Sequence, residues 1–343
     1  MVNHYIGADV HSNNVELSVE RKGRIIQRHS LPTSIRAIRE VLDRIASPKH
    51  LTFEEGPLAG WLYRNLKDRV DTLVVCDPRR NRLIASDGDK DDRIDAAKLA
   101  ALLRGGYLRA VYHTDDAERL SLKRWVALYH DRVQAATRSI NKLRACARLC
   151  GERIPRSVLH DVVVRRTWLA GLDRDLADQL RLLWRSYDSC RTDVRIARRQ
   201  MRRRARRFPI ISYWSVLPGM GPIRSATLFA YLDTPWRFQK KTQLWKYCGV
   251  GLQRTSSGKD RRGRDRPARL ALVWMVNRHL KNAVMGMATS AIRSRDNMFR
   301  DAYEERIRHG ALASNARHAV ARKMLTVVWG MWKSQRPFDA RVC

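Results

Sequence analysis

Apolar residues recur every seven positions in two long stretches of this chain. The first stretch carries Val126, Val133, Ile140 and Ala147, with Tyr129, Ala136, Leu143 and Cys150 in the complementary positions. After a break at 151–155, the second carries Leu169, Leu176, Leu183, Cys190 and Ala197, interleaved with Leu180, Tyr187, Val194 and Met201. Such a repeat places an apolar seam along a long helix. We therefore predict two long helices joined by a short break, forming an antiparallel hairpin or coiled coil within the chain or across a dimer.

Strand and helix patterns alternate before this helical region. We predict strands at 5–9, 15–20, 24–29, 51–54 and 72–76, and helices at 35–45, 58–67 and 94–103, the first of them capped by Ser34. Strands that are first paired and then alternate with helices indicate an α/β sheet covered by helices.

Four carboxylates lie where these elements begin or end. Asp9 ends the first predicted strand, Glu54 ends a later one, and Asp92 and Asp95 share one face of a helix start. Acids converging in this way suit Mg²⁺ or Mn²⁺, which prefer oxygen ligands, and two such ions serve phosphodiester chemistry. The alternative for Asp92 and Asp95 is a solvated first helical turn, where acids are favoured by the helix dipole.

The charge of the chain is strongly positive. It has 68 Lys and Arg against 34 Asp and Glu, a formal net charge of +34, which indicates a polyanionic partner. The basic residues are spread over the whole length, which favours nucleic acid over an amphipathic membrane anchor. The densest run, at 198–207, includes Arg202, Arg203 and Arg204, for which we predict phosphate contacts.

Other features favour a cytoplasmic, nucleoid-associated protein. No apolar run approaches the roughly 20 residues that span a bilayer, and the chain begins directly with a strand pattern, so we expect no signal peptide and no membrane partner. The six cysteines are scattered without a CxxC pair, which indicates free thiols.

The region after residue 208 is predicted to be mostly helical, with helices at 270–283 and 316–332. Residues 217–222, Leu-Pro-Gly-Met-Gly-Pro, resemble a helix-hairpin-helix turn whose glycines let the backbone approach a phosphate, or else form a packing corner. Residues 252–267 form a loop rich in hydroxyl, glycine and guanidinium groups. From composition alone, this loop fits either a phosphate-binding linker or a segment with Ser257 as nucleophile.

These motifs, in this order, resemble the DEDD transposases of the IS110 insertion-sequence family. The resemblance rests on an Asp in a first strand, the Glu of Phe-Glu-Glu-Gly-Pro at 53–57, the helix start Asp-Arg-Ile-Asp-Ala at 92–96, the 217–222 turn, and Trp-Lys-Tyr-Cys-Gly-Val at 245–250 followed by Ser-Gly at 257–258. It implies a RuvC-like (RNase H-like) mixed-sheet domain at 1–112, a coiled-coil region at 113–207 and a C-terminal transposase domain at 208–343.

The same resemblance implies the site. Asp9, Glu54, Asp92 and Asp95 would bind Mg²⁺ or Mn²⁺, and Ser257 would attack a DNA phosphodiester to form a covalent phosphoserine. Glu55 and Ser256 are the neighbouring alternatives. The Gly-Pro at 56–57 favours Glu54, and the spacing from Gly249 favours Ser257. The arginine-rich 261–269 segment departs from the family pattern. Four nearby cations would contact the phosphate: Arg254, Lys259, Arg261 and Arg262.

The partners implied by the resemblance are donor and target double-stranded DNA, a structured guide RNA encoded by the element, and further copies of the chain in a homodimer or tetramer formed through the coiled coil. Two rival functions remain at this stage. One is a metal-dependent Holliday-junction resolvase that uses water as nucleophile, and the other is a non-catalytic nucleic-acid-binding protein.

Overall fold

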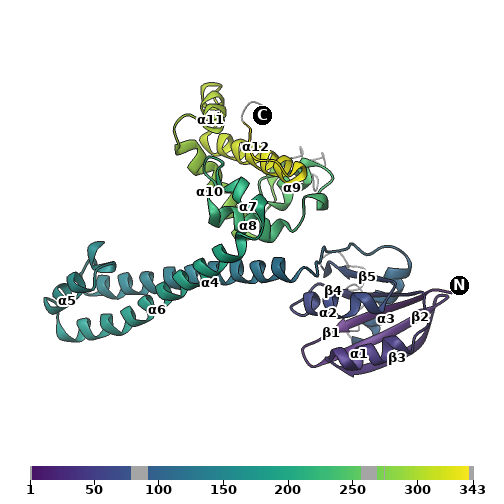
Figure 1. The fold of residues 1–343 in the computed structure, drawn as a ribbon. Coiled ribbons are helices and arrows are strands. Elements are labelled where there is room, and N and C mark those ends of the chain that lie inside the picture. Colours follow the sequence, from purple (N-terminus) through teal and green to yellow (C-terminus); the bar gives the residue numbers. More distant parts are fainter. Residues whose placement is uncertain (1, 79–91, 256–268, 274, 340–343) are drawn as a thin grey trace, which may run out of the picture. The chain divides into compact units, whose positions relative to one another are not determined.

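A computed structural model describes residues 2–78, 92–255, 269–273 and 275–339 of the chain (Figure 1). The chain divides into two compact units, Met1–Asp116 and Ala117–Cys343, and each is described here by itself. The three-domain division expected from the sequence stays a prediction.

The first unit is built on a five-stranded mixed sheet with the order β3-β2-β1-β4-β5. The first three strands are antiparallel neighbours, whereas β4 and β5 run parallel to β1. The strands are β1 (His4–Val10), β2 (Asn14–Arg21), β3 (Arg24–Pro32), β4 (Lys49–Glu54) and β5 (Thr72–Cys76). All five predicted strands are confirmed, with ends that differ by at most a few residues.

Helices of this unit contact both faces of the sheet. Ile6 and Ala8 of β1 belong to an apolar core shared with α1 (Ile35–Asp43) and α2 (Ala59–Leu66), which the short turn η1 (Lys67–Arg69) follows. Gly7 points the other way, toward α3 (Asp92–Arg104). The three predicted helices are confirmed, although α1 ends at Asp43, and Ser34 occupies its N-cap without a side-chain hydrogen bond.

In the second unit, two long helices, α4 (Ala117–Leu149) and α6 (Arg174–Ala205), lie side by side (Figure 1). They are antiparallel, because contacts join early residues of one to late residues of the other: Ser121 to Arg204, Ser139 to Cys190, and Cys146 to Gln179. The apolar repeat therefore forms a hairpin within the chain.

The connection between these helices is longer than the sequence suggests. The turn η3 (Ser157–Leu159) and the short helix α5 (Val162–Ala170) separate them, and α6 begins only after Asp173, whose carboxylate accepts hydrogen bonds from the amides of Asp175 and Leu176. Leu169 lies on α5, so its assignment to the second long helix is wrong. An N-cap aspartate starts a new helix there despite the continuing apolar spacing.

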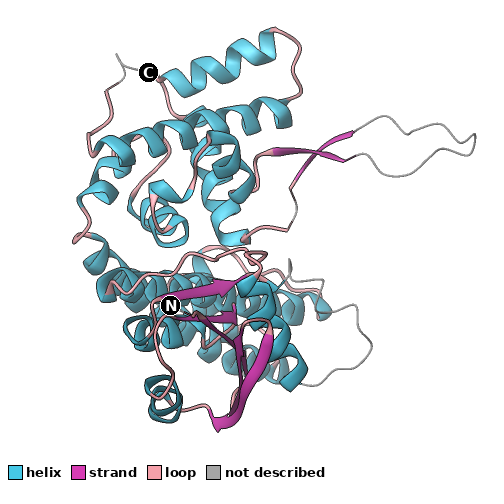
Figure 2. Cartoon of the chain, turned by 90° about the vertical axis from the view of Figure 1, so that its right-hand side faces the viewer, coloured by secondary structure: helices cyan, strands magenta, loops and turns pink. Residues whose placement is uncertain are grey.

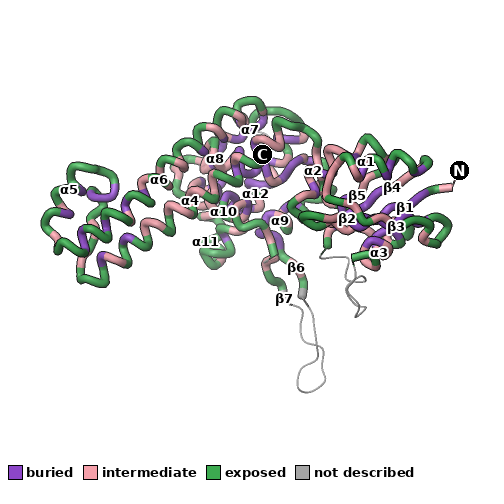
Figure 3. Tube along the Cα trace, turned by 90° about the horizontal axis from the view of Figure 1, so that it is seen from below, coloured by how far each residue is buried: buried purple, intermediate pink, exposed green. Residues whose placement is uncertain are grey.

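The remaining helices pack around a large apolar core, which appears as buried segments in Figure 3. At its centre the indole of Trp214 packs edge-on against Trp332, with ring centroids 5.0 Å apart, and donates to the carbonyl of Val328. The elements are α7 (Pro209–Ser215), α8 (Pro222–Leu232), η4 (Pro235–Arg237), α9 (Lys241–Tyr247), α10 (Arg278–Arg293), α11 (Met298–Arg308) and α12 (Ala313–Ser334).

A two-stranded ribbon, β6 (Leu252–Thr255) and β7 (Arg269–Leu272), extends from this helical part (Figure 2). The prediction of a helix from residue 270 is therefore wrong at its start. Leu270 pairs with Arg254 in the ribbon, and the helix begins at Arg278, capped by the Asn277 side chain. The predicted helix at 316–332 is confirmed as part of α12.

The turn before α8 contains two glycines with different surroundings. Gly219 packs against a neighbouring helix, and Gly221 has open space beside it. A Cβ on Gly219 would lie 2.2 Å from the carbonyl oxygen of Met287, so this glycine lets the turn contact α10. Gly221, the N-cap of α8, has φ +101° and open space beside it. Only Gly221 therefore leaves room for a ligand at the start of α8.

The five described cysteines are free. Among the described residues, no helix has the length and apolar character needed to cross a membrane.

Candidate functional site

Asp9 and Glu54 are brought to one edge of the sheet by strand pairing. The parallel register joins Gly7 to Thr52 and Ala8 to Phe53, so the next positions, 9 and 54, lie on neighbouring strands. Side chains two apart on a strand share a face. Asp9 and Glu54 therefore lie on the same face as Gly7 and Thr52, the face that α3 covers.

Gly7 allows α3 to approach this face closely. A Cβ at Gly7 would lie 2.0 Å from the carbonyl oxygen of Ala96 and 2.6 Å from the amide of Ala100, which is closer than atoms can pack. With no side chain between helix and strand, the first turn of α3 lies beside the end of β1. That turn carries Asp92 and Asp95.

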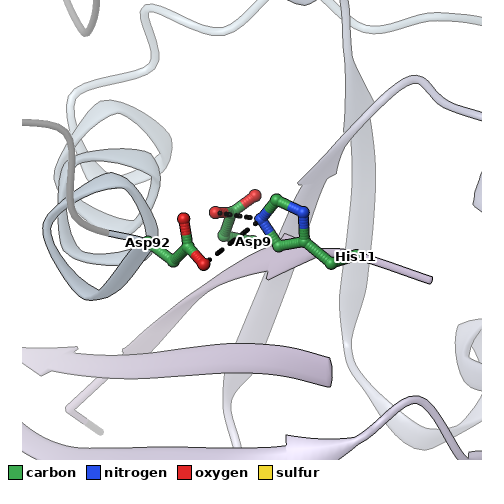
Figure 4. A group of neighbouring side chains, drawn as sticks. All are labelled: Asp9, His11 and Asp92. Carbon is green, nitrogen blue, oxygen red and sulfur yellow. Dashed lines mark hydrogen bonds and ion pairs between the residues drawn. The ribbon is translucent and has the colours of Figure 1, made fainter. Parts of the chain in front are cut away.

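The His11 side chain contacts the carboxylates of both Asp9 and Asp92 (Figure 4). Its Nε2 atom lies 3.1 Å from Oδ2 of Asp9 and 3.5 Å from Oδ2 of Asp92. These three side chains each offer a ligand atom, and the ligand atoms lie within 4.8 Å of one another. A donor set of two carboxylates and an imidazole, contributed by a strand, the turn after it and a helix, fits a divalent cation.

Electrostatics distinguish Asp9 from its neighbours. Burial raises the pKa of the Asp9 carboxyl, the hydrogen bond and charge of His11 lower it, and the negative charges of Asp92 and Asp95 raise it further. The pKa of His11 is raised, chiefly by its hydrogen bond to Asp9. Asp95 thus acts on Asp9 through its charge, although it lies outside the close Asp9–His11–Asp92 group. A cation would relieve the repulsion among these carboxylates.

The two adjacent glutamates have different surroundings. Glu54 is the last residue of β4 and half-buried, whereas Glu55 is exposed and lies 2.5 Å from Nε2 of His113. Their strand alternation points them in opposite directions.

Two residues of this edge were not identified from the sequence. His11 follows Asp9 by two positions, and an imidazole so close in sequence to a strand-end carboxylate was the available signal. Glu16 is the cross-strand partner of Asp9 and is 8% exposed, with a hydrogen bond from Ser30 and an ion pair to Arg93 at 3.9 Å. A charged residue among apolar positions of β2 was its signal.

The segment at 245–250, which precedes Ser257 in the sequence, is held against α12 by two hydrogen bonds. Trp245 of α9 donates to Thr326 of α12, and Arg322 of α12 donates to the carbonyl of Val250. Gly249, at φ +75°, turns the chain from α9 into β6. Arg254 is exposed on β6, while Ser256, Ser257, Lys259, Arg261 and Arg262 lie outside the described residues.

The predicted basic contacts at the end of α6 fall into two groups. Arg202 and Arg203 are exposed and line one groove of about 630 Å³ with Arg195, Arg198, Arg199 and Arg206. Arg204 faces the hairpin instead. It donates to Ser121 and Gln200, and its guanidinium lies 4.9 Å from the ring centroid of Trp125.

Two models of known protein families match this sequence, one in its N-terminal part and one in its C-terminal part. Residues 6–150 match the DEDD transposase model of the IS110 type, described as a transposase, and residues 214–304 match the model described as "Transposase IS116/IS110/IS902 family". No curated protein matches the chain. Together the two models cover well over half of the sequence.

These matches define an enzyme that acts on DNA, a transposase or recombinase of an insertion sequence. The chain belongs to the IS110 family of transposases. Family membership favours this activity over the resolvase and over the non-catalytic binding protein.

Proposed function

We propose that this transposase cuts and rejoins the DNA of its insertion element with Asp9, Glu54, Asp92 and Asp95 as the metal-binding tetrad and Ser257 as the nucleophile. The observation that carries the proposal is the meeting of Asp9 and Asp92, from a strand end and a helix start, around a shared position beside His11. Acids this close in a chain of net charge +34 are suited to holding a cation.

The sheet supports an RNase H-like, or RuvC-like, assignment of the first unit. Three antiparallel strands followed by two parallel ones, in the order β3-β2-β1-β4-β5, place the ends of the central strands β1 and β4 side by side. An acid at each of these ends and two acids on the adjoining helix form one continuous carboxylate edge. Glu54 is favoured over Glu55 because Glu54 shares the face of Asp9 while Glu55 pairs with His113.

Divalent metal ions, Mg²⁺ or Mn²⁺, would neutralise phosphate charge and orient the reacting oxygens when bound. Asp9, Asp92, Asp95 and Glu54 would hold them. Ser257 Oγ would give up its proton and form a bond to a DNA phosphorus, the bond from that phosphorus to one sugar oxygen would break, and the released oxygen would take up a proton. The reverse attack by a sugar hydroxyl rejoins the strand and frees the serine.

Cations beside the serine would hold the reacting phosphate. Arg254 is exposed on β6, the strand that leads into the serine segment. Lys259, Arg261 and Arg262 follow in sequence, outside the described residues. Guanidinium groups bind phosphate oxygens in a bidentate manner and would stabilise the charge that develops during transfer.

A second basic surface, on α6, would bind nucleic acid. The six exposed arginines of the α6 groove recur at intervals of three and four residues, so they form one stripe along about 17 Å of helix. In the described part of the chain, none of them forms an ion pair with a carboxylate. Exposed arginines contact phosphates, which every nucleic acid carries. This stripe would therefore bind the backbone of donor or target DNA, or of a structured guide RNA, without selecting bases.

An apolar groove in the middle of the α4–α6 hairpin supports assembly into a homodimer or tetramer. The groove has a volume of about 370 Å³, and its apolar walls come from both helices, with Ile140 and Val194 among them. Leu143 and Ala147, nearer the tip, are buried, whereas the heptad positions Val133, Ile140 and Val194 of this part are only half-buried. A second copy of the hairpin would cover them.

A recombination assay tests the proposal. Element-end DNA, target DNA and transcript from the element's non-coding end are incubated with full-length protein and Mg²⁺ or Mn²⁺. We expect Asp9→Asn and Asp92→Asn to lower joined product by about a thousandfold or more, with nucleic-acid binding retained. Asp43→Asn, which changes an exposed acid paired with Arg69, is the matched control and should recombine normally. Full activity of Asp9→Asn would refute the proposed tetrad.

A further inference from the structure

We infer that His11 is itself a metal ligand, so that this site is a mixed nitrogen–oxygen site that selects Mn²⁺ over Mg²⁺. The inference rests on the proposed function and concerns the ion that this site takes. It adds an imidazole from this chain to the four acids.

The His11 ring is placed where a metal ligand would be. Its Nε2 atom faces both carboxylates at once, 3.1 Å from Asp9 and 3.5 Å from Asp92 (Figure 4). In an octahedral site with metal–ligand bonds of about 2.1 Å, adjacent ligand atoms are about 3 Å apart. His11 Nε2 therefore stands near the spacing of an adjacent ligand from each carboxylate, and all three donor atoms lie within 4.8 Å of one another.

The backbone holds His11 in place. Its amide donates to the carbonyl of Asn14 at 2.9 Å, and its carbonyl accepts from the hydroxyl of Thr33 at 2.9 Å. These bonds tie the turn between β1 and β2 to the residue that follows β3. A ligand on a fixed turn loses less conformational freedom on binding than one on a free side chain.

An alternative role is a neutral or charged partner that merely balances the acids. That role accounts for the same two contacts through one N–H on Nε2 directed at both carboxylates. It also predicts that His11 leaves when a cation enters, so the metal would then be held by oxygen atoms only. The two roles therefore differ in an observable, which is nitrogen in the coordination shell.

The chemistry of the donor sets the choice of ion. Mg²⁺ prefers oxygen ligands, keeps its waters and dehydrates reluctantly. An imidazole nitrogen is a softer donor that serves first-row transition ions. Adding one to a carboxylate site strengthens the binding of Mn²⁺ more than the binding of Mg²⁺.

The test uses full-length protein and the ions alone, without nucleic acid. Pulsed EPR of Mn²⁺ bound to the unmodified protein should show coupling to a ¹⁴N nucleus, and His11→Ala should lose that coupling. By calorimetry, His11→Ala should weaken Mn²⁺ binding by about tenfold or more and Mg²⁺ binding clearly less. His29→Ala is the matched control, because His29 lies on β3 and contacts Gln27; it should change neither.

Several results would overturn the inference. Tight Mn²⁺ binding without nitrogen coupling in the unmodified protein shows an oxygen-only site, and this measurement does not depend on whether a variant folds. Equal loss of Mn²⁺ and Mg²⁺ affinity in His11→Ala removes the proposed selectivity. In either case, loss of recombination in Asp9→Asn still supports the tetrad, so the inference fails alone. If neither ion binds, the inference and the metal site both fail.

Discussion

Gly7 and Ala96 are so close that a Cβ on Gly7 would lie 2.0 Å from the carbonyl oxygen of Ala96. The sheet and α3 thus meet through backbone at this position, and the meeting places Asp9 beside Asp92. The geometry of the acidic edge depends on a residue that carries no chemistry of its own.

Gly7→Ala should therefore destabilise the first unit and move α3 away from β1. The backbone of α3 must give way, so we expect a loss of about 1–3 kcal/mol or more in the free energy of unfolding, measured by urea denaturation. Metal affinity should fall with it because Asp92 moves. Gly60→Ala is the control, since a Cβ there meets only Arg64 at 3.7 Å and His113 at 3.8 Å, and an alanine favours helix α2. A Gly7→Ala protein as stable as the Gly60→Ala protein would contradict the close packing.

The second unit should lose stability in mild acid through His130. Burial lowers the pKa of this imidazole to about 4, and the nearby His279 ring, 4.7 Å away, contributes. The Thr227 hydroxyl donates to Ile223, so it accepts from Nε2 of a neutral His130. The unfolded chain takes up a proton near pH 6.5. Between about pH 6.5 and 4 the unfolded state binds more protons, and stability falls as pH falls.

Urea midpoints measured between pH 7.5 and 5 check this expectation. The slope due to His130 should be smaller than about 1.4 kcal/mol per pH unit, because the ring is only partly buried and solvent screens its charge. His130→Gln keeps a donor for Thr227 and should flatten the dependence. His309→Gln, on an exposed histidine of the same unit, should leave it unchanged. An unchanged slope in His130→Gln would show that another group is responsible.

Arg203 and Arg204 are neighbours with opposite roles. Arg203 belongs to the exposed stripe, whereas Arg204 ties α6 to Ser121 and Trp125 of α4. Arg203→Ala should weaken nucleic-acid binding uniformly across sequences and reduce the salt dependence by about one phosphate contact. Arg204→Ala should instead lower the free energy of unfolding by an amount typical of a lost charged hydrogen bond, about 1.5–3 kcal/mol. Titrations of double-stranded DNA and structured RNA at several salt concentrations distinguish the two variants, and the reverse assignment of effects would refute the stripe.

The sequence predicts the sheet well because its strands are local apolar runs with clear turns between them. Asp9, Glu54, Asp92 and Asp95 could also be selected, since each stands at the end of a predicted element. His11 could not be selected in the same way. A single histidine in a polar turn has the same local pattern whether it faces solvent or two carboxylates, and its direction follows from pairing with β2 and from the approach of α3.

The errors in the helical part have related causes. Leu270 is apolar in a short segment, where strand and helix patterns are alike, and its strand forms only because β6 pairs with it. Leu169 lies seven residues before Leu176 and so fits the repeat, but it belongs to α5, because Asp173 caps the start of α6 between them. Arg204 has the same side chain as its neighbours and differs only in its helix face, which packs against Ser121 and Trp125 of α4.

The most direct test of the account is to trap the covalent intermediate. Full-length protein, element-end DNA, non-coding transcript and divalent metal are mixed, quenched in denaturant and examined for protein-bound DNA by gel and mass spectrometry. We predict an adduct on Ser257 in the unmodified protein, and none in Ser257→Ala or Asp9→Asn. Strand cleavage without any adduct, or an adduct that persists in Ser257→Ala, would contradict the proposed division of labour between the acidic edge and the serine.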